Sequence, residues 1–142
     1  MNEAASIIVI AGGGQAAGTA VCRLRQLGYR GRLVLITDEQ ALPYERPGLS
    51  KAFLLGEMAG PRAILAAAQA NERILAGTRV VGLDRARREV LTSAGAIAYD
   101  RLLLATGAQP RRLAVAGADL PGIHVLRSAL DAARIAADLE HC

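Results

Sequence analysis

Aromatic side chains are scarce in this sequence, which has one phenylalanine, three tyrosines and no tryptophan among 142 residues. A core must therefore be packed mostly from alanine, leucine, isoleucine and valine, and the 52% apolar composition supplies them. The formal net charge of +4 raises the question of a nucleic-acid partner. The arginines are scattered in ones and twos without interleaved aromatics, so we expect a solvated surface and no nucleic-acid binding.

Cysteine and long apolar runs are also lacking. Cys22 and Cys142 lie far apart, with neither a CxxC motif nor the spacing of metal ligands, so we expect no metal site. Cys22 is expected to pack in a helix, and the cysteine usage favours a reduced, cytoplasmic setting. No apolar run approaches the ~18–20 residues that span a membrane, and the start, MNEAAS, does not resemble a signal peptide. We therefore expect no membrane partner.

The stretch at residues 6–18, SIIVIAGGGQAAG, joins an apolar run to a glycine turn and the start of a helix. The run is typical of a strand buried on both faces in a parallel sheet. The order strand, glycines, helix is that of a dinucleotide-binding turn. Gly12 would permit the tight turn, Gly14 would let backbone N–H groups approach a pyrophosphate, and Ala17 would fill the small packing position. The helix, from Gln15, would present its positive N-terminus to the phosphates.

Periodicity and turn residues predict the other elements. Helices are expected over Gln15–Leu27, Arg62–Glu72 and Ser128–Glu140, with a helical turn over Lys51–Leu55 capped by Ser50. Strands are expected over Leu33–Ile36, Arg79–Asp84, Glu89–Ser93, Ala96–Asp100 and Leu102–Ala105, the middle three as an antiparallel meander. Ser128 and Asp131 have the spacing of a capping box. These elements predict an α/β fold with a parallel sheet, flanking helices and a three-stranded antiparallel β-meander in one domain, residues 1–142.

Two polar residues stand out beyond the second strand and in the loop after it. Asp38 occupies the position from which an acid hydrogen-bonds an adenosine ribose, although Glu39 competes for that role and an ordinary turn residue is the alternative. An acid there would also repel a 2′-phosphate. Lys51 is the only lysine, and a cation in the first turn of a helix opposes the dipole. A carboxylate or an electron-rich ring nearby would explain it; a flexible surface lysine is the alternative.

Several other residues have two interpretations each. Arg46 could reach a phosphate or pair with Glu45, and Tyr44 could stack on a ring or be a loop tyrosine. Thr106 and Gly107 end a buried strand, so they should lie in the same crevice as Gly12 or act only as a strand terminator. Arg127 could contact a phosphate or ring, or be solvated. Neither histidine, at positions 124 and 141, has an acid or cysteine partner in the sequence, so neither is assigned a catalytic role.

Four stretches together resemble one family: VIAGGGQAAG, LITDEQALPYERPGLSKAFLLGE, YDRLLLATGAQPRRL and HVLRSALDA. They are similar to the N-terminal FAD-binding part of bacterial NAD(P)H-dependent ferredoxin, rubredoxin and putidaredoxin reductases, which share the glutathione-reductase architecture. The resemblance covers nearly the whole chain. It implies a Rossmann-like FAD/NAD(P)-binding domain and a reaction in which electrons pass from NAD(P)H through FAD to a ferredoxin-type iron–sulfur protein.

The resemblance also implies roles for individual residues. Gly12, Gly14 and Ala16, with Gln15 and Ala17 in the same turn, would hold the FAD pyrophosphate, and Asp38 the adenosine ribose. Further along the chain, Arg46 and Lys51 would lie along the cofactor, with Lys51 tuning the flavin near its reactive edge. The adenine and the rim of the cleft would be contacted by Val80, Thr106, Gly107 and Arg127.

The sequence departs from the family in three ways. Gly48 stands where the family usually has a second proline, which makes the loop before Lys51 freer. No cysteine pair follows the first helix, which favours electron transfer through flavin over a dithiol mechanism. The family's nicotinamide-binding and C-terminal segments are missing, so we expect a fragment with only an N-terminal part of the FAD domain, weak or absent flavin and no turnover alone. Unfilled apolar faces would then favour self-association.

Two alternative functions stay open. The chain could belong to a related flavoenzyme, such as the reductase-like part of a nitrite reductase. It could also be a non-catalytic module that binds a dinucleotide without redox chemistry.

Overall fold

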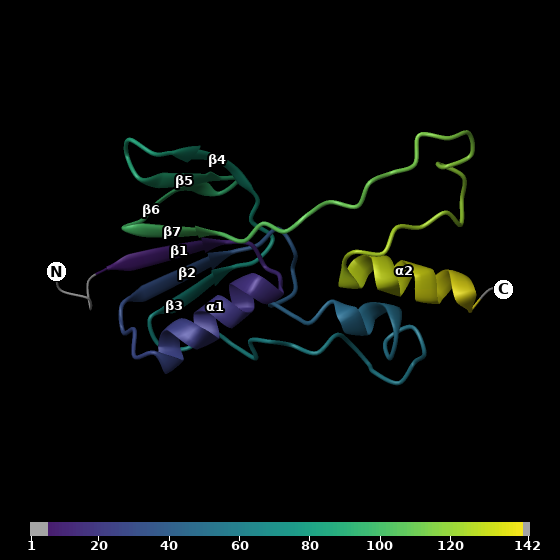
Figure 1. Cartoon of the computed structure of the whole chain (residues 1–142), viewed down its shortest axis with the longest axis horizontal. Helices are drawn as coiled ribbons and strands as arrows, with labels where there is room; N and C mark the ends of the chain where they lie inside the picture. The colour runs from purple at the N-terminus through teal and green to yellow at the C-terminus, as the bar shows by residue number, and fades with distance from the viewer. Residues whose placement is uncertain (1–5, 141–142) are drawn as a thin grey trace. The chain divides into compact units, whose positions relative to one another are not determined.

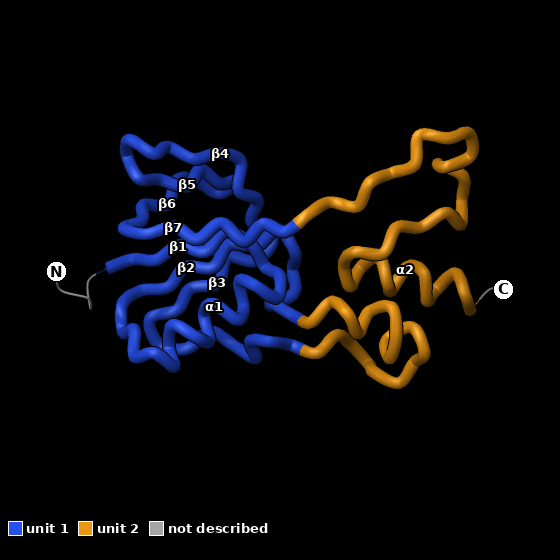
Figure 2. The backbone as a smooth tube through the Cα atoms, viewed as in Figure 1, with its two compact units in different colours: residues 1–44, 63–107 blue, residues 45–62, 108–142 orange. Residues whose placement is uncertain are grey.

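A computed structural model describes residues 6–140; Cys142 and His141 therefore lie outside the described residues. The chain divides into two compact units, which are described separately (Figure 2). Unit 1 comprises residues 1–44 and 63–107, and unit 2 comprises residues 45–62 and 108–142. No helix within the described residues is long and apolar enough to cross a membrane.

The centre of unit 1 is a four-stranded parallel sheet in the order β3-β2-β1-β7 (Figure 1). Its strands are β1 (Ile7–Ala11), β2 (Arg32–Ile36), β3 (Glu72–Leu75) and β7 (Arg101–Leu104). Successive strands β1, β2 and β3 run outward in one direction, whereas β7 pairs with the other side of β1. The strand order therefore reverses next to β1, which creates the switch point where ligands bind in open α/β sheets.

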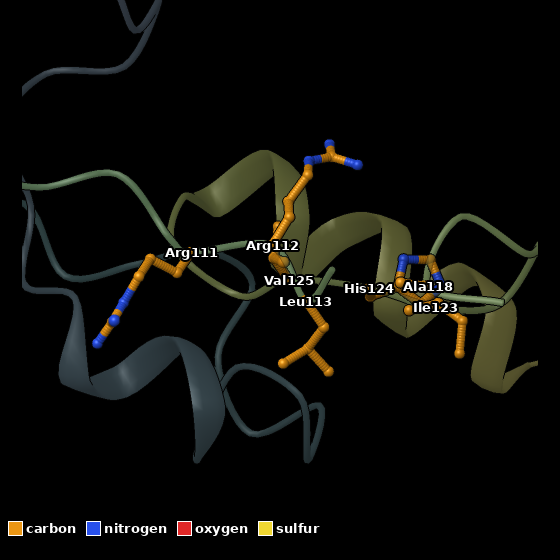
Figure 3. Close-up of a pocket in the computed structure, with 7 residues that line it drawn as sticks. All are labelled: Arg111, Arg112, Leu113, Ala118, Ile123, His124 and Val125. Atoms are coloured by element: carbon orange, nitrogen blue, oxygen red, sulfur yellow. The ribbon is translucent and has the colours of Figure 1, made fainter. Parts of the chain in front are cut away.

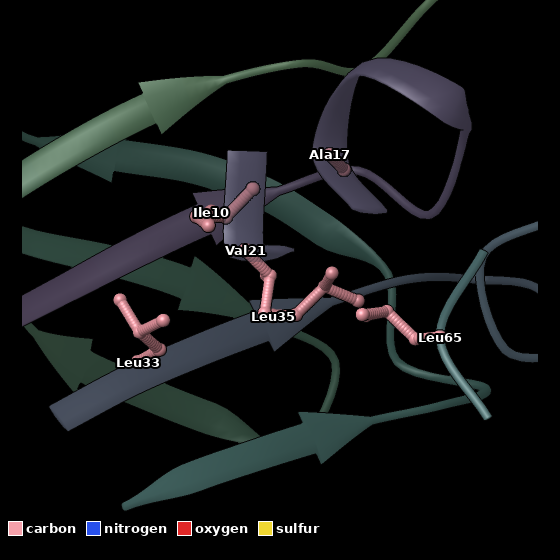
Figure 4. Packing of buried hydrophobic residues seen from close by; sticks show 6 residues of the cluster. All are labelled: Ile10, Ala17, Val21, Leu33, Leu35 and Leu65. Carbon is pink, nitrogen blue, oxygen red and sulfur yellow. The ribbon is translucent and has the colours of Figure 1, made fainter. Parts of the chain in front are cut away.

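Helix α1 (Gln15–Gln26) packs on one face of this sheet. Its small side chains Ala17 and Val21 contact Ile10, Leu33 and Leu35, and all five are almost fully buried (Figure 4). Cys22 belongs to the same helix and packs against this core, as its sequence context predicts. The apolar residues of β1 are buried on alternate faces, because the opposite face of the sheet is also covered.

The antiparallel meander covers that second face. It consists of β4 (Val80–Asp84), β5 (Glu89–Thr92) and β6 (Gly95–Ala98), paired in that order with a register shift in β4. Val90 of β5 packs against Val9, Val34 and Ile36 of the parallel sheet. The predicted parallel sheet and three-stranded meander are thus confirmed.

The predicted helix over residues 62–72 is wrong. The chain there contains no helix: Ala63 bridges to Tyr44, and the backbone N–H of Ile64 donates to the carbonyl of Pro43 at 2.7 Å. Leu65 is drawn into the core beside α1, and Asn71 takes a positive φ of 64° just before β3 begins. Helix propensity is a weak preference, and these long-range contacts override it.

Unit 2 contains a short 3₁₀ helix, η2 (Pro47–Ser50), and the helix α2 (Ala129–Leu139). Ser50 ends η2, and no hydrogen bond of its hydroxyl is found within residues 6–140, so its predicted role as a cap is wrong. A single turn follows, in which the N–H of Leu55 donates to the carbonyl of Lys51 at 3.0 Å. The predicted capping box of α2 is confirmed: Ser128 and Asp131 exchange hydrogen bonds at the helix start.

Candidate functional site

The glycine turn after β1 fits tightly between two neighbouring strands of the sheet. The N–H of Gly12 donates to the carbonyl of Ile36 at 2.8 Å, and the N–H of Ala105 donates to the carbonyl of Ala11 at 2.8 Å. Gly12 has a φ of 138°, and a Cβ atom there would overlap the backbone carbonyl of Ala105. Only glycine meets both conditions, so the role predicted for Gly12 in the tight turn is supported by its geometry.

A different neighbour leaves no room for a side chain at Gly13. A Cβ atom at this position would overlap the hydroxyl and Cβ of Thr37, the residue that follows β2. Thr37 is 3% exposed, and its hydroxyl also accepts a hydrogen bond from the N–H of Glu39 at 3.2 Å. Thr37 thus supports the glycine turn and the acidic loop together. Thr37 is not among the predicted site residues, and its position at the carboxyl end of a strand is its only signal in the sequence.

The start of α1 is open to a ligand. Gly14 is the N-cap, no side chain caps the helix, and its first turn contains no acidic residue. Gln15 and Ala16 are exposed, whereas Ala17 is fully buried against the sheet. The backbone N–H groups of this turn and the positive end of the helix dipole can therefore receive an anion such as a phosphate.

The two acids beyond β2 have different surroundings. The hydroxyl of Tyr44, which is 2% exposed, donates a short hydrogen bond to the Glu39 carboxylate. Asp38 is exposed, and its side chain makes no hydrogen bond or ion pair within residues 6–140. The structure therefore favours Asp38 over Glu39 as the group that would bind a ribose, because Glu39 is already held by the protein. Burial of Tyr44 also leaves its ring unable to stack on a ligand here.

The other predicted residues of unit 1 lie on the strands and turns around this edge. Thr106 and Gly107 follow β7, next to the Gly12 turn, and Gly107 has a φ of 71°. Val80 begins β4 and is half-buried against the core shared by the two sheets. The topology thus brings the carboxyl ends of β1, β2 and β7 to one edge (Figure 1).

In unit 2, Arg46 and Arg127 are joined although they lie far apart in the sequence. The Arg46 guanidinium donates through Nη1 to the backbone carbonyl of Arg127 at 2.7 Å. Glu45, the partner considered for Arg46, has its carboxylate 3.6 Å from the Arg62 guanidinium on the surface. Arg46 is therefore oriented by the backbone that precedes α2.

Lys51 follows the end of η2, so it does not occupy the first turn of a helix as predicted. Lys51 stands between the C-terminus of η2 and the single turn in which its carbonyl accepts the N–H of Leu55. Lys51 is exposed, and its ammonium has no hydrogen-bond or ion-pair partner among the described residues. Its proposed role near a flavin therefore stays a prediction.

A small cavity of about 110 Å³ in unit 2 does not form a second site. It is lined by Arg111, Arg112, Leu113, Ala118, Ile123, His124 and Val125. Figure 3 shows the Arg111 and Arg112 side chains pointing away from each other, so they do not converge on an anion. His124 instead pairs with Asp138 of α2 at 2.7 Å, a partner that the sequence did not reveal.

With this geometry established, comparison with known proteins identifies the family. Residues 6–141 match the family model described as "Pyridine nucleotide-disulphide oxidoreductase". The chain belongs to this family. Cys22 is a free cysteine within α1, and no group of three or more potential metal ligands occurs in the described part of the chain. This member of the oxidoreductase family has no cysteine pair after the first helix.

Relatives within the family include reductase components of multi-protein systems. The chain is 48% identical over 128 residues to the biphenyl dioxygenase system ferredoxin–NAD(+) reductase component of Paraburkholderia xenovorans, covering 87% of this chain and 31% of that protein. It is 43% identical to the p-cumate 2,3-dioxygenase system ferredoxin–NAD(+) reductase component of Pseudomonas putida, covering 99% and 36%.

Solved structures agree with these relatives. The reductase in the covalent putidaredoxin reductase–putidaredoxin complex has a TM-score of 0.82 and 35% identity, covering 94% of this chain and 34% of that one. The chain thus spans about a third of the length of the relatives it matches.

Proposed function

We propose that this oxidoreductase chain forms an N-terminal part of an FAD-binding domain, residues 1–142, in a bacterial NAD(P)H-dependent ferredoxin reductase of the cytoplasm. The observation that carries the proposal is the uncapped, acid-free start of α1 behind a turn that only glycine can form. This arrangement fits a dinucleotide pyrophosphate, because it offers backbone N–H donors and leaves no side chain in the way.

Different residues would bind different parts of the cofactor. Gly12, Gly14 and Ala16, with their neighbours Gln15 and Ala17, would bind the pyrophosphate through the backbone. Asp38 would accept hydrogen bonds from the adenosine ribose hydroxyls, which also excludes a 2′-phosphate. The adenine and the rim of the cleft would be contacted by Val80, Thr106 and Gly107, and the remaining contacts would come from Arg46, Lys51 and Arg127.

FAD, when bound, supplies the means to accept a hydride from NAD(P)H and to pass single electrons to a ferredoxin-type iron–sulfur protein. The share of this chain is to hold and orient the cofactor and, through Lys51, to place a positive charge near the flavin ring. The names of the relatives support this assignment, since they are NAD(+) reductases for ferredoxin and rubredoxin. We also propose that this chain self-associates through apolar faces that it leaves unfilled.

Binding of two nucleotides to the purified chain tests the proposal. ADP-ribose, which has the adenine, ribose and pyrophosphate, should bind in calorimetry. In a longer protein that contains this chain, it should also compete with FAD, as followed by flavin fluorescence anisotropy. Its 2′-phosphate derivative should bind at least about tenfold more weakly, because Asp38 would face a second negative charge. Asp38→Asn should narrow that difference, whereas Asp119→Asn, an exposed acid in unit 2, should leave it unchanged.

Absence of saturable binding by either nucleotide contradicts the proposal. Binding of FAD that NADH fails to reduce in a longer protein containing this chain would instead support a non-catalytic dinucleotide-binding module.

A further inference from the structure

We propose that Asp131 is a positioning residue for Arg46, acting through the peptide group between Arg127 and Ser128. The inference rests on the proposed function, in which the Arg46 guanidinium contacts the cofactor. All four residues belong to unit 2, so the geometry among them is internal to that unit.

The first step is the hydrogen bond that orients Arg46. Its Nη1 lies 2.7 Å from the carbonyl oxygen of Arg127, a short distance typical of hydrogen bonds with a charged donor. A guanidinium is planar with five N–H donors in a fixed arrangement, so fixing one donor restricts the direction of the others. The hydrogen bond to the Arg127 carbonyl therefore restricts the direction of the Arg46 guanidinium.

The second step is the peptide group that carries this carbonyl. The carbonyl of Arg127 and the N–H of Ser128 belong to one planar unit and point in opposite directions. The Ser128 N–H donates to Oδ2 of Asp131 at 2.8 Å, while the carbonyl on the other side receives Arg46. Asp131 and Arg46 thus bind opposite sides of the same peptide group.

Asp131 holds this peptide firmly because one of its oxygens collects three donors. Oδ2 also accepts the N–H of Arg127 at 3.1 Å and the hydroxyl of Ser128 at 2.8 Å. Burial by itself raises the pKa of Asp131. The hydrogen bonds and the positive charge of Arg134 lower the pKa by more than burial raises it, so the net shift is downward. The carboxylate is therefore ionised at neutral pH and accepts these bonds in its stronger, charged form.

A capping box alone would need Asp131 only to start α2. The shared peptide adds a consequence beyond helix stability: losing the acceptor frees the peptide to rotate and removes this constraint on the direction of Arg46. Asp131→Ala should therefore weaken FAD binding by about tenfold, on the order of the loss of one hydrogen bond to a charged group. Asp131→Asn retains an oxygen in the same place and should bind FAD within about twofold of the wild type.

A double-mutant cycle separates this role from general loosening of the fold. In a longer protein that contains this chain, FAD affinity is measured by flavin fluorescence anisotropy in the wild type, Asp131→Ala, Arg46→Ala and the double variant, with Asp119→Ala as the matched control. Positioning through Arg46 predicts that Asp131→Ala has no further effect once Arg46 is gone. An equal loss with and without Arg46 overturns the proposal.

A second readout needs no cofactor. In arginine-labelled protein, the guanidinium N–H signals of Arg46, assigned with Arg46→Lys, should exchange slowly in the wild type and Asp131→Asn and fast in Asp131→Ala. If Asp131→Ala does not fold, acidification of the wild type decides the question. Protonating Asp131, whose charged neighbour is Arg134 and which accepts the backbone N–H groups of Arg127 and Ser128, should shift the Arg46 signals. Asp131→Asn should abolish that titration.

The outcomes distinguish the two proposals. In a longer protein that contains this chain, failure of FAD to bind, or an unchanged affinity in Arg46→Ala, contradicts the proposed function and leaves the ligand-free signals to decide the positioning. Arg46 signals that are the same in the wild type and Asp131→Ala, or that do not follow the titration of Asp131, overturn the positioning itself.

Discussion

Arg25 ties the end of α1 to the starts of two strands, and replacing it should destabilise unit 1 strongly. Its Nε lies 2.9 Å from the Glu72 carboxylate at the start of β3, with the two side chains 12% and 3% exposed. Its other nitrogens donate to the backbone carbonyls of Tyr29, Gly31 and Asn71 at 2.8, 3.0 and 3.1 Å. The guanidinium also lies over the Tyr29 ring, 5.7 Å from its centre.

Arg25→Met removes these bonds and leaves the buried Glu72 carboxylate without its guanidinium partner, although the N–H of Gln69 still donates to it at 2.9 Å. Removing one member of a buried ion pair costs about 3–5 kcal/mol, because the remaining charge is not solvated. Arg23→Met is the matched control: Arg23 lies in the same helix, is exposed, and donates at 3.3 Å to Gln26. Its effect should stay within about 0.5 kcal/mol.

Urea denaturation followed by tyrosine fluorescence measures this difference. The chain has no tryptophan, and its three tyrosines, at positions 29, 44 and 99, all lie in unit 1, so the signal reports that unit alone. Arg25→Met combined with Glu72→Met should recover part of the loss, because no unpaired charge is then buried. If the free energy of unfolding of Arg25→Met is within about 1 kcal/mol of that of Arg23→Met, the buried-pair reasoning is refuted.

Three further predictions follow from single positions. Gly12→Ala should lower the free energy of unfolding by more than about 2 kcal/mol in the same assay, since strain at positive φ and overlap with Ala105 add together. The pKa of Asp131 is lowered from its ordinary 3.8, so its stabilisation is present above that pH and lost as the pH falls through the lower folded value; Asp131→Asn should reduce the acid sensitivity of α2 in circular dichroism. In a flavin-loaded protein containing this chain, Lys51→Met should lower the flavin reduction potential by removing a nearby positive charge, whereas Arg62→Met on the exposed surface should not.

Features that are determined by residues within a short stretch of sequence could be predicted. The apolar run before Gly12 forms β1, the glycines form the turn, and the pair Ser128 and Asp131 forms the cap of α2. In each case the residues that interact are within a few positions of one another, or glycine meets a backbone requirement of its own. The same is true of the meander, whose strands are joined by short turns.

Features that depend on contacts between residues far apart in the sequence could not be predicted. Residues 62–72 have good helix formers, but Ile64 pairs with Pro43 and Leu65 enters a core built by other elements. Arg25 lies near the end of α1, but its partners are Glu72 and backbone carbonyls in the loops before β2 and β3. No local pattern shows which long-range contact will form, so propensity alone gives the wrong answer at such positions.

The two acids after β2 show why the distant contacts matter for function. From the sequence, Asp38 is the preferred candidate for the ribose, and Glu39, one residue further on, competes with it. The buried hydroxyl of Tyr44 holds Glu39, which leaves Asp38 as the exposed carboxylate at the edge of the sheet. The same pattern recurs at Gly13, backed by Thr37, and at the peptide before α2, held by Asp131. In each case a supporting side chain decides which group can meet a ligand. Glu39→Gln should therefore alter nucleotide affinity only as far as it disturbs Asp38, and Tyr44→Phe should have an effect in the same direction.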